Sequence, residues 1–399
     1  MLDRDHIITS ATIRPCGGQP AILDGAVLVR GDTITAVGGR ATVTEQAAPD
    51  ARHTDLPGCT IMPGLIDGAV RLTLSGDATP YEDLPRDQQQ GTLGQRVAGN
   101  GLRTLLSGVT TIRDVGEADG AVLRYRRQIA DQLAIGPRVL CSGAPLTIPG
   151  GDGSLLGGAV DSDDAIRAAV RAHADSGAEF LSYHDSGGYF PGPWHRKGWL
   201  THFTPEQCQL LVEEAHRQGL RVSAHTYAAD GAWHAITAGV DIIDHLVWME
   251  AQGQFGRDEA AAIDMHRRGI IACLPSASNR RHMIANNGEQ AAFDRWYSRY
   301  TWLDERGVSL LIGSNAGVTT SPFGDYVSAL ETYEWLGFGD RTLEVATSEA
   351  ARALRLDKTV GVLAPGMAAD LIAVPGDPAA DLQVLRSVAL VMARGQVIS

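Results

Sequence analysis

Two hydrophobic patterns divide the chain. Up to about residue 62, short β-rich runs such as residues 7–13 and 26–30 alternate with turn residues, which is typical of strands joined by tight turns. From Gly64 onward, short apolar runs alternate with stretches of helical period. This alternation predicts parallel strands joined by crossover helices, and about eight such units predict a closed α/β barrel of the (β/α)8, TIM type.

The end of the chain returns to the first pattern, with β-rich runs at residues 370–374 and 388–393. We therefore expect the N- and C-terminal segments to pair into one small β-sandwich side domain. The predicted organisation is 1–62 and 356–399 for the two parts of this side domain, and 63–355 for the barrel. Within the barrel, the predicted strands after the first are 108–114, 138–141, 180–183, 221–225, 241–245, 270–273 and 309–313.

Composition narrows the class of protein. Apolar residues make up 44% of the 399-residue chain and charged residues 20%, as in ordinary soluble proteins with a large core. The formal net charge of −13 argues against nucleic acid or an anionic membrane as a partner. Five scattered cysteines without CxxC spacing favour a reducing compartment. We expect a cytoplasmic protein that acts on a small-molecule substrate and that could form a homo-oligomer.

Motifs at both ends of the predicted barrel point to one family. Residues 63–67 read Pro-Gly-Leu-Ile-Asp, and residues 361–371 follow the pattern G-x-L-x-P-G-x-x-A-D-L. Together they resemble the amidohydrolase superfamily over nearly the whole chain. Residues 177–181, 214–220 and 238–241 are most similar to the branch with imidazolonepropionase-like and Xaa-Pro dipeptidase-like members.

The resemblance implies where metal ligands would stand. The family uses a His-x-His pair on the first strand, a carboxylated lysine on the fourth, one histidine each on the fifth and sixth, and an aspartate on the eighth. In this sequence these positions hold Ala69, Arg71, Ser182, His225, His245 and Asn315. Alanine cannot bind a metal and arginine is a fixed cation. The chain is thus expected to be a divergent member that has lost most of its metal ligands, with no metal or cofactor.

The remaining side chains are still suited to proton transfer. Residues two apart on a strand share a face, so we expect Ser182 and His184 to point toward the barrel axis, and Tyr227 to lie beside His225. The predicted catalytic residues are His225, His245, Arg71 and His184. The predicted substrate-binding residues are Tyr227, Asn315, Ser182, Asp185, Trp248 and Asp152, the last of which replaces a histidine of the family's T-G-G-H-G loop.

Some of these residues have structural interpretations as well. Arg71 could form an ion pair with Asp67 or Asp114, and His225 and His245 could be retained only for packing. The aromatic and glycine-rich segments 185–195, 248–249 and 276–282 are predicted to shape the pocket or to form a subunit contact.

Three functions remain open at this stage. The first is a metal-independent enzyme that performs acid–base chemistry, such as elimination, isomerisation, cyclisation or C–C cleavage. The second is a hydrolase of C–N bonds that keeps one metal through His225, His245 and a third ligand from Asp185 or His184. The third is a non-catalytic binding protein on the same fold.

Overall fold

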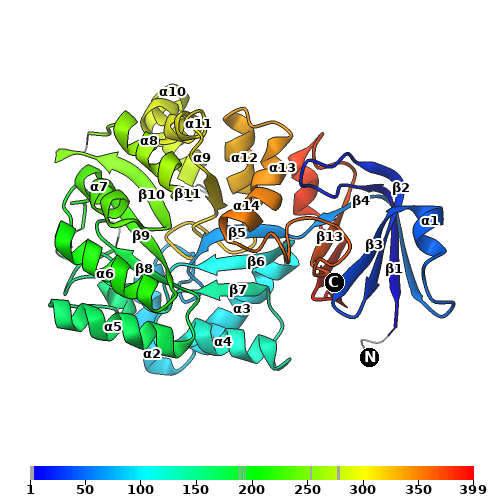
Figure 1. Cartoon of the computed structure of the whole chain (residues 1–399), viewed down its shortest axis with the longest axis horizontal. Helices are drawn as coiled ribbons and strands as arrows, with labels where there is room; N and C mark the ends of the chain where they lie inside the picture. Colours follow the sequence, from blue (N-terminus) through cyan, green and yellow to red (C-terminus); the bar gives the residue numbers. More distant parts are fainter. Residues whose placement is uncertain (1–3, 188–189, 192, 194, 252–253, 276–278) are drawn as a thin grey trace.

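The structure is a computed structural model that describes residues 4–187, 190–191, 193, 195–251, 254–275 and 279–399. Figure 1 shows a helix-covered barrel beside a smaller β domain that contains the N-terminal strands. Eight parallel strands form the barrel, as predicted: β5 (Leu65–Val70), β6 (Val109–Asp114), β7 (Arg138–Cys141), β8 (Phe180–His184), β9 (Arg221–Ala228), β10 (Ile242–Met249), β11 (Ile271–Pro275) and β12 (Leu310–Gly313).

The barrel strands belong to two hydrogen-bonded sheets, β5-β6-β7 and β8-β9-β10-β11-β12. Parallel bridges join these sheets at both seams, between Leu146 and Tyr183 and between Val70 and Ala316. The larger helices are α2 (Pro80–Gln90), α3 (Leu93–Leu106), α4 (Ala121–Ala130), α5 (Asp163–Ser176), α6 (Pro205–Arg217), α7 (Ala229–Ala238), α8 (Glu259–Arg268), α9 (Asn279–Asn287) and α12 (Val327–Trp335). The shorter ones are α10 (Glu289–Ala292), α11 (Ser298–Asp304), α13 (Arg341–Val345), α14 (Ser348–Ala353) and the one-turn segments η1 (Ser154–Leu156), η3 (Phe293–Tyr297) and η4 (Leu382–Arg386).

Local sequence explains where the helices begin and end. Helix α6 starts with a capping box, in which the Thr204 side chain accepts from the Gln207 backbone and the Gln207 side chain accepts in return, with proline at its first position. Helix α5 ends at Ser176 and is capped by Gly177, whose φ of 82° is left-handed. Helices α13 and α14 are separated near Thr347, whose backbone leaves the helical region (ψ −94°).

The side domain pairs the two ends of the chain, as expected. Its strands are β1 (His6–Ile13), β2 (Ile22–Arg30), β3 (Thr33–Gly39), β4 (Arg52–Pro63), β13 (Leu371–Pro375), β14 (Leu390–Ala393) and β15 (Gln396–Val397). They form one sheet in the order β15-β14-β13-β4-β1-β2-β3. A bridge between Thr33 and Ala368 brings β3 next to the segment that leads into β13, so the sheet curls. Its strands share one apolar core. Helix α1 (Arg40–Thr44) contributes Val43 to a second small core.

Two further properties of the described residues bear on the predictions. All five cysteines have free thiols. No described helix combines the length and the apolar character that crossing a bilayer would require.

Candidate active site

A cavity of about 320 Å³ opens at the carboxyl ends of the barrel strands, where α/β barrels hold their active sites. Five of its lining residues were predicted from sequence as catalytic or substrate-binding. Arg71 directly follows β5, His225 and Tyr227 lie on β9, His245 lies on β10, and Asn315 lies in the loop after β12. Asp152, from the loop after β7, lines it as well. The strand ends therefore bring six predicted site residues to one cavity.

The imidazoles of this site are in mutual contact. The ring centroids of His184 and His225 are 4.2 Å apart with an interplanar angle of 11°, and those of His225 and His245 are 4.5 Å apart at 71°. The Tyr227 hydroxyl lies 3.2 Å from Nδ1 of His245. All three histidines are at most 7% exposed.

His225 presents a basic nitrogen. Its Nδ1 lies 3.0 Å from the Ser186 carbonyl oxygen, and because a carbonyl only accepts, Nδ1 carries the proton and Nε2 the lone pair. Burial, together with the nearby His184, His245 and Arg71, holds the pKa of His225 well below its ordinary value. Burial and Arg71 also lower the pKa of His245 to about 3. Both rings are therefore neutral bases at physiological pH.

Arg71 is a buried cation in this site. Its side chain is about 1% exposed, its Nη1 donates to Oδ1 of Asn315 at 3.1 Å, and its guanidinium lies 5.8 Å from the centroid of the Phe190 ring. Within the described part of the chain no carboxylate lies close enough to form an ion pair with it, and its buried Nε has no hydrogen-bond acceptor. The alternative prediction of an ion pair with Asp67 or Asp114 is therefore wrong; Asp114 instead accepts backbone hydrogen bonds from Leu72 and Gly116.

Backbone strain is found at the same place. His245 (φ 71°) and Asn315 (φ 56°) adopt left-handed conformations, although neither is glycine. Such conformations cost about 1–3 kcal/mol and are concentrated at functional sites. The fold thus holds both side chains toward the cavity at an energetic cost.

The metal centre of the family does not fit the residues present. Ala69 has no donor atom, Arg71 brings a positive charge, and Asn315 is hydrogen-bonded to that charge. The hydroxyl of Ser182 is buried without a partner and does not line the cavity. His225 and His245 alone fall short of the three protein ligands of a catalytic zinc.

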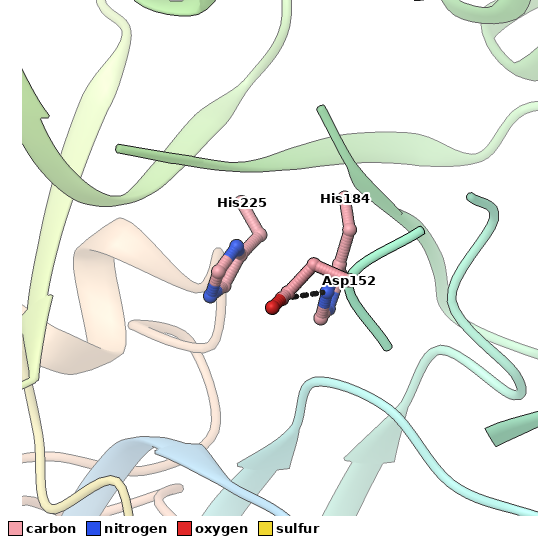
Figure 2. Close-up of side chains that lie close together, drawn as sticks. All are labelled: Asp152, His184 and His225. Atoms are coloured by element: carbon pink, nitrogen blue, oxygen red, sulfur yellow. Dashed lines mark hydrogen bonds and ion pairs between the residues drawn. The ribbon is translucent and has the colours of Figure 1, made fainter. Parts of the chain in front are cut away.

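Another group of potential metal ligands consists of Asp152, His184 and His225, whose side chains lie close together (Figure 2). Their ligand atoms lie within 4.8 Å of one another, and Nδ1 of His184 is 3.1 Å from Oδ2 of Asp152. However, an imidazole lone pair lies in its ring plane, and the planes of His184 and His225 are nearly parallel. The two rings cannot converge on one ion in this arrangement. Burial lowers the pKa of His184, and its contact with Asp152 only partly offsets this effect.

Four predicted site residues do not line the cavity: His184, Ser182, Asp185 and Trp248. His184 contacts it indirectly by stacking on His225. Asp185 lies on the far side of β8, 3.9 Å from His234 of α7. Trp248 is turned away, because β10 has an irregular register before Met249 and positive φ at Trp248 (51°), and it packs edge-on against Trp302. The substrate-binding roles of Ser182, Asp185 and Trp248 thus gain no support.

Other lining residues carry no motif and were not predicted individually, although Phe190 lies in segment 185–195, which was predicted to shape the pocket. These residues come from α2, the loop after β8, the segment from η3 to α11 and the loop after β12. They include Tyr81, Phe190, Trp296, Tyr297, Arg299, Tyr300, Val318, Thr319 and Thr320. The excess of aromatic residues around η3 was a usable signal. Of the loops predicted to shape the pocket, Gly188, Tyr189, Gly192, Trp194 and residues 276–278, as well as the side chain of His282, lie outside the described residues.

Comparison with known proteins agrees with the barrel fold. The model of the amidohydrolase family matches residues 60–289 and 302–398, and the chain belongs to this family. It is 27% identical to an ochratoxinase of Aspergillus niger, over 95% of this chain and 83% of that protein. It is 26% identical to an imidazolonepropionase of Mesorhizobium japonicum, over 89% and 87%. A solved Xaa-Pro dipeptidase with methionine in its active site has the same fold (TM-score 0.86, 22% identity, 99% of this chain and 100% of that one).

Proposed function

We propose that this protein hydrolyses a C–N bond next to a carbonyl in a small, partly aromatic substrate, with Arg71 in the electrophilic role that a metal has in the family. The observation that carries this proposal is the convergence of a buried cation and neutral histidine bases on one cavity. The relatives named as an ochratoxinase, an imidazolonepropionase and a dipeptidase support a hydrolytic reaction.

Each group has a defined task in this proposal. Arg71 binds the carbonyl oxygen and stabilises the negative charge that develops on it as water attacks. Nε2 of His225 accepts the proton of that water and then delivers it to the leaving nitrogen. Tyr227 orients His245 through their 3.2 Å contact. The aromatic wall from Trp296 to Tyr300 provides an apolar surface for the substrate.

Isotope labelling tests hydrolysis directly. We would incubate the protein with a panel of N-acyl amino acids, anilides and aryl carbamates in H₂¹⁸O and analyse the acyl products by mass spectrometry. Hydrolysis places one ¹⁸O in the new carboxylate, and the His225→Asn variant, which keeps a similar shape, should be inactive. The metal content measured by plasma mass spectrometry should be the same in both proteins. Metal lost together with His225 would contradict the role of Arg71.

A second candidate is metal-independent elimination, isomerisation, cyclisation or C–C cleavage. It is favoured by Asn315, which stands where the family has its proton-transferring aspartate and cannot itself titrate, and by the two neutral histidines beside a phenol. This reaction would give products without ¹⁸O from water. Thermal stabilisation by a ligand that is never converted would instead indicate the third possibility, a non-catalytic binding protein.

A further inference from the structure

A second cluster of potential metal ligands lies outside the cavity, between the barrel and its outer helices. Asp185 directly follows β8, Cys208 lies on α6 and His234 lies on α7, three neighbouring elements of the barrel wall (Figure 1). Their ligand atoms, a carboxylate oxygen, a thiol sulfur and an imidazole nitrogen, lie within 4.8 Å of one another. None of the three lines the cavity.

The polar atoms of this cluster are incompletely satisfied. Oδ2 of Asp185 and Nδ1 of His234 are both buried without a hydrogen-bond partner, although they are 3.9 Å apart. The Asp185 side chain has no exposure to solvent, and only its other oxygen accepts a hydrogen bond, from the Phe203 backbone at 3.1 Å. Buried polar atoms are nearly always paired. Two buried, unpartnered atoms that lie 3.9 Å apart, too far for a hydrogen bond, leave room for an ion that both could bind.

We propose that Asp185, Cys208 and His234 form a binding site for a thiophilic divalent cation such as zinc. Zinc prefers this mixture of sulfur, nitrogen and oxygen ligands in tetrahedral sites. Three protein ligands leave a fourth position for water. His234 is about 18% exposed and gives the ion a route from solvent.

Binding requires the release of protons. Burial raises the pKa of the Cys208 thiol above its ordinary value, so the sulfur is protonated in the metal-free protein, and it must lose this proton to solvent as the metal–sulfur bond forms. Burial also raises the pKa of Asp185 to about 7, so part of the carboxyl population loses a proton as well. The metal replaces these protons as the positive partner of both groups.

The site is connected to the active centre through the backbone. The Asp185 N–H donates to the His225 carbonyl oxygen at 3.0 Å, and Asp185 is the neighbour of His184. A metal that fixes Asp185 therefore fixes the ends of β8 and β9. It would position the histidines without contacting substrate.

Cobalt titration distinguishes this site from every site without sulfur. We expect Co²⁺ added to the purified metal-free protein to produce the near-ultraviolet charge-transfer band of a cobalt thiolate, saturating at one ion per chain. Cys208→Ser should abolish the band. Cys141→Ser should keep it, because Cys141 is an equally buried barrel cysteine whose sulfur lies 3.7 Å from Glu179.

A second variant tests the site even if Cys208→Ser does not fold. His234→Ala, at a partly exposed position, should keep the native circular dichroism but weaken cobalt binding by more than about 100-fold, since even outer-shell partners cost 10- to 100-fold. Absence of a thiolate band in the native protein, or its persistence in folded Cys208→Ser, would overturn the proposal. Because the readout is spectroscopic, neither result depends on the hydrolytic function.

Discussion

At the scale of single residues, Arg71 has opposing effects on activity and stability. We expect Arg71→Gln to lower kcat/KM by about 10²–10³-fold, the usual loss for a group that stabilises a developing oxyanion. The free energy of unfolding should stay the same or rise, because a buried charge without an anionic partner is costly. Enzyme kinetics and calorimetry measure the two effects.

The matched control for Arg71 is Arg306→Gln. Arg306 also contacts an aromatic ring, Trp302, but it is paired with the exposed Glu259, so its loss should change neither quantity much. A fall of several kcal/mol in the stability of Arg71→Gln would instead show that this residue is structural.

The buried histidines predict an unusual pH profile. A neutral histidine base with an ordinary pKa near 6.5 loses activity as the pH falls through that value. Burial and Arg71 lower the pKa of His245 to about 3, and burial and the neighbouring histidines lower that of His225. We therefore expect kcat/KM to remain level from pH 7 to pH 5. The acid limb should move upward in Arg71→Gln, and a native limb centred near pH 6.5 would contradict the buried-base interpretation.

Site residues could be predicted from sequence only where family motifs identify the end of a barrel strand. His225, His245, Arg71 and Asn315 occupy positions set by strand ends, and strand geometry brings them together. Arg299 and Tyr300 lie on the short helix α11 between β11 and β12, whose position follows from packing and not from a motif. Trp248 was misplaced because the strand was expected to end at His245, whereas β10 continues to Met249 with an irregular register.

At the scale of elements, the loop after β7 fixes Asp152 against His184. Gly153 precedes η1 with φ 76°, and a Cβ atom there would lie 2.7 Å from Nδ1 of His184. Gly157 follows η1 with φ 100° and has open space around it. The two glycines thus need the same kind of backbone conformation, but only one of them contacts the histidine cluster.

This difference gives a paired prediction. Gly157→Ala should lose about 1 kcal/mol or somewhat more of stability from backbone strain alone, with activity retained. Gly153→Ala should lose more stability and most of its activity, because His184 must move away from Asp152 and from its stack on His225. Chemical denaturation and turnover of the two variants test it, and equal effects would show that the loop does not position the histidine.

At the scale of the whole molecule, the barrel was predictable because its alternation of apolar runs and helices extends over most of the chain. Pairing of the chain ends was also predictable, since both carry the same short β-rich pattern. The sequence did not predict that β1–β4 and β13–β15 join into one curled sheet, because this joining depends on the parallel register of β1 with β4. Sequence likewise gave no sign of the ion pair at the centre of the barrel.

That ion pair ties four strands together. Arg113 on β6 contacts Asp244 on β10 at 2.9 Å, donates to the Gly68 carbonyl on β5 at 2.9 Å, and is hydrogen-bonded to Ser223 on β9. Arg113 and Asp244 are at most 2% exposed. Burial alone would raise the pKa of Asp244, but Arg113 overrides this effect and holds it below the ordinary value.

Removing one partner leaves the other buried and unpaired. We expect Asp244→Leu or Arg113→Met to lower the free energy of unfolding by about 3–5 kcal/mol each, whereas the double variant should lose far less than the sum, because an apolar pair can replace a buried ion pair at little cost. Removing the exposed Arg306–Glu259 pair should cost no more than about 1 kcal/mol. Urea unfolding of the four proteins of the cycle measures the coupling. Additive losses would mean that the four strands are held by packing alone, and the strand ends that carry His225 and His245 would then not depend on this pair.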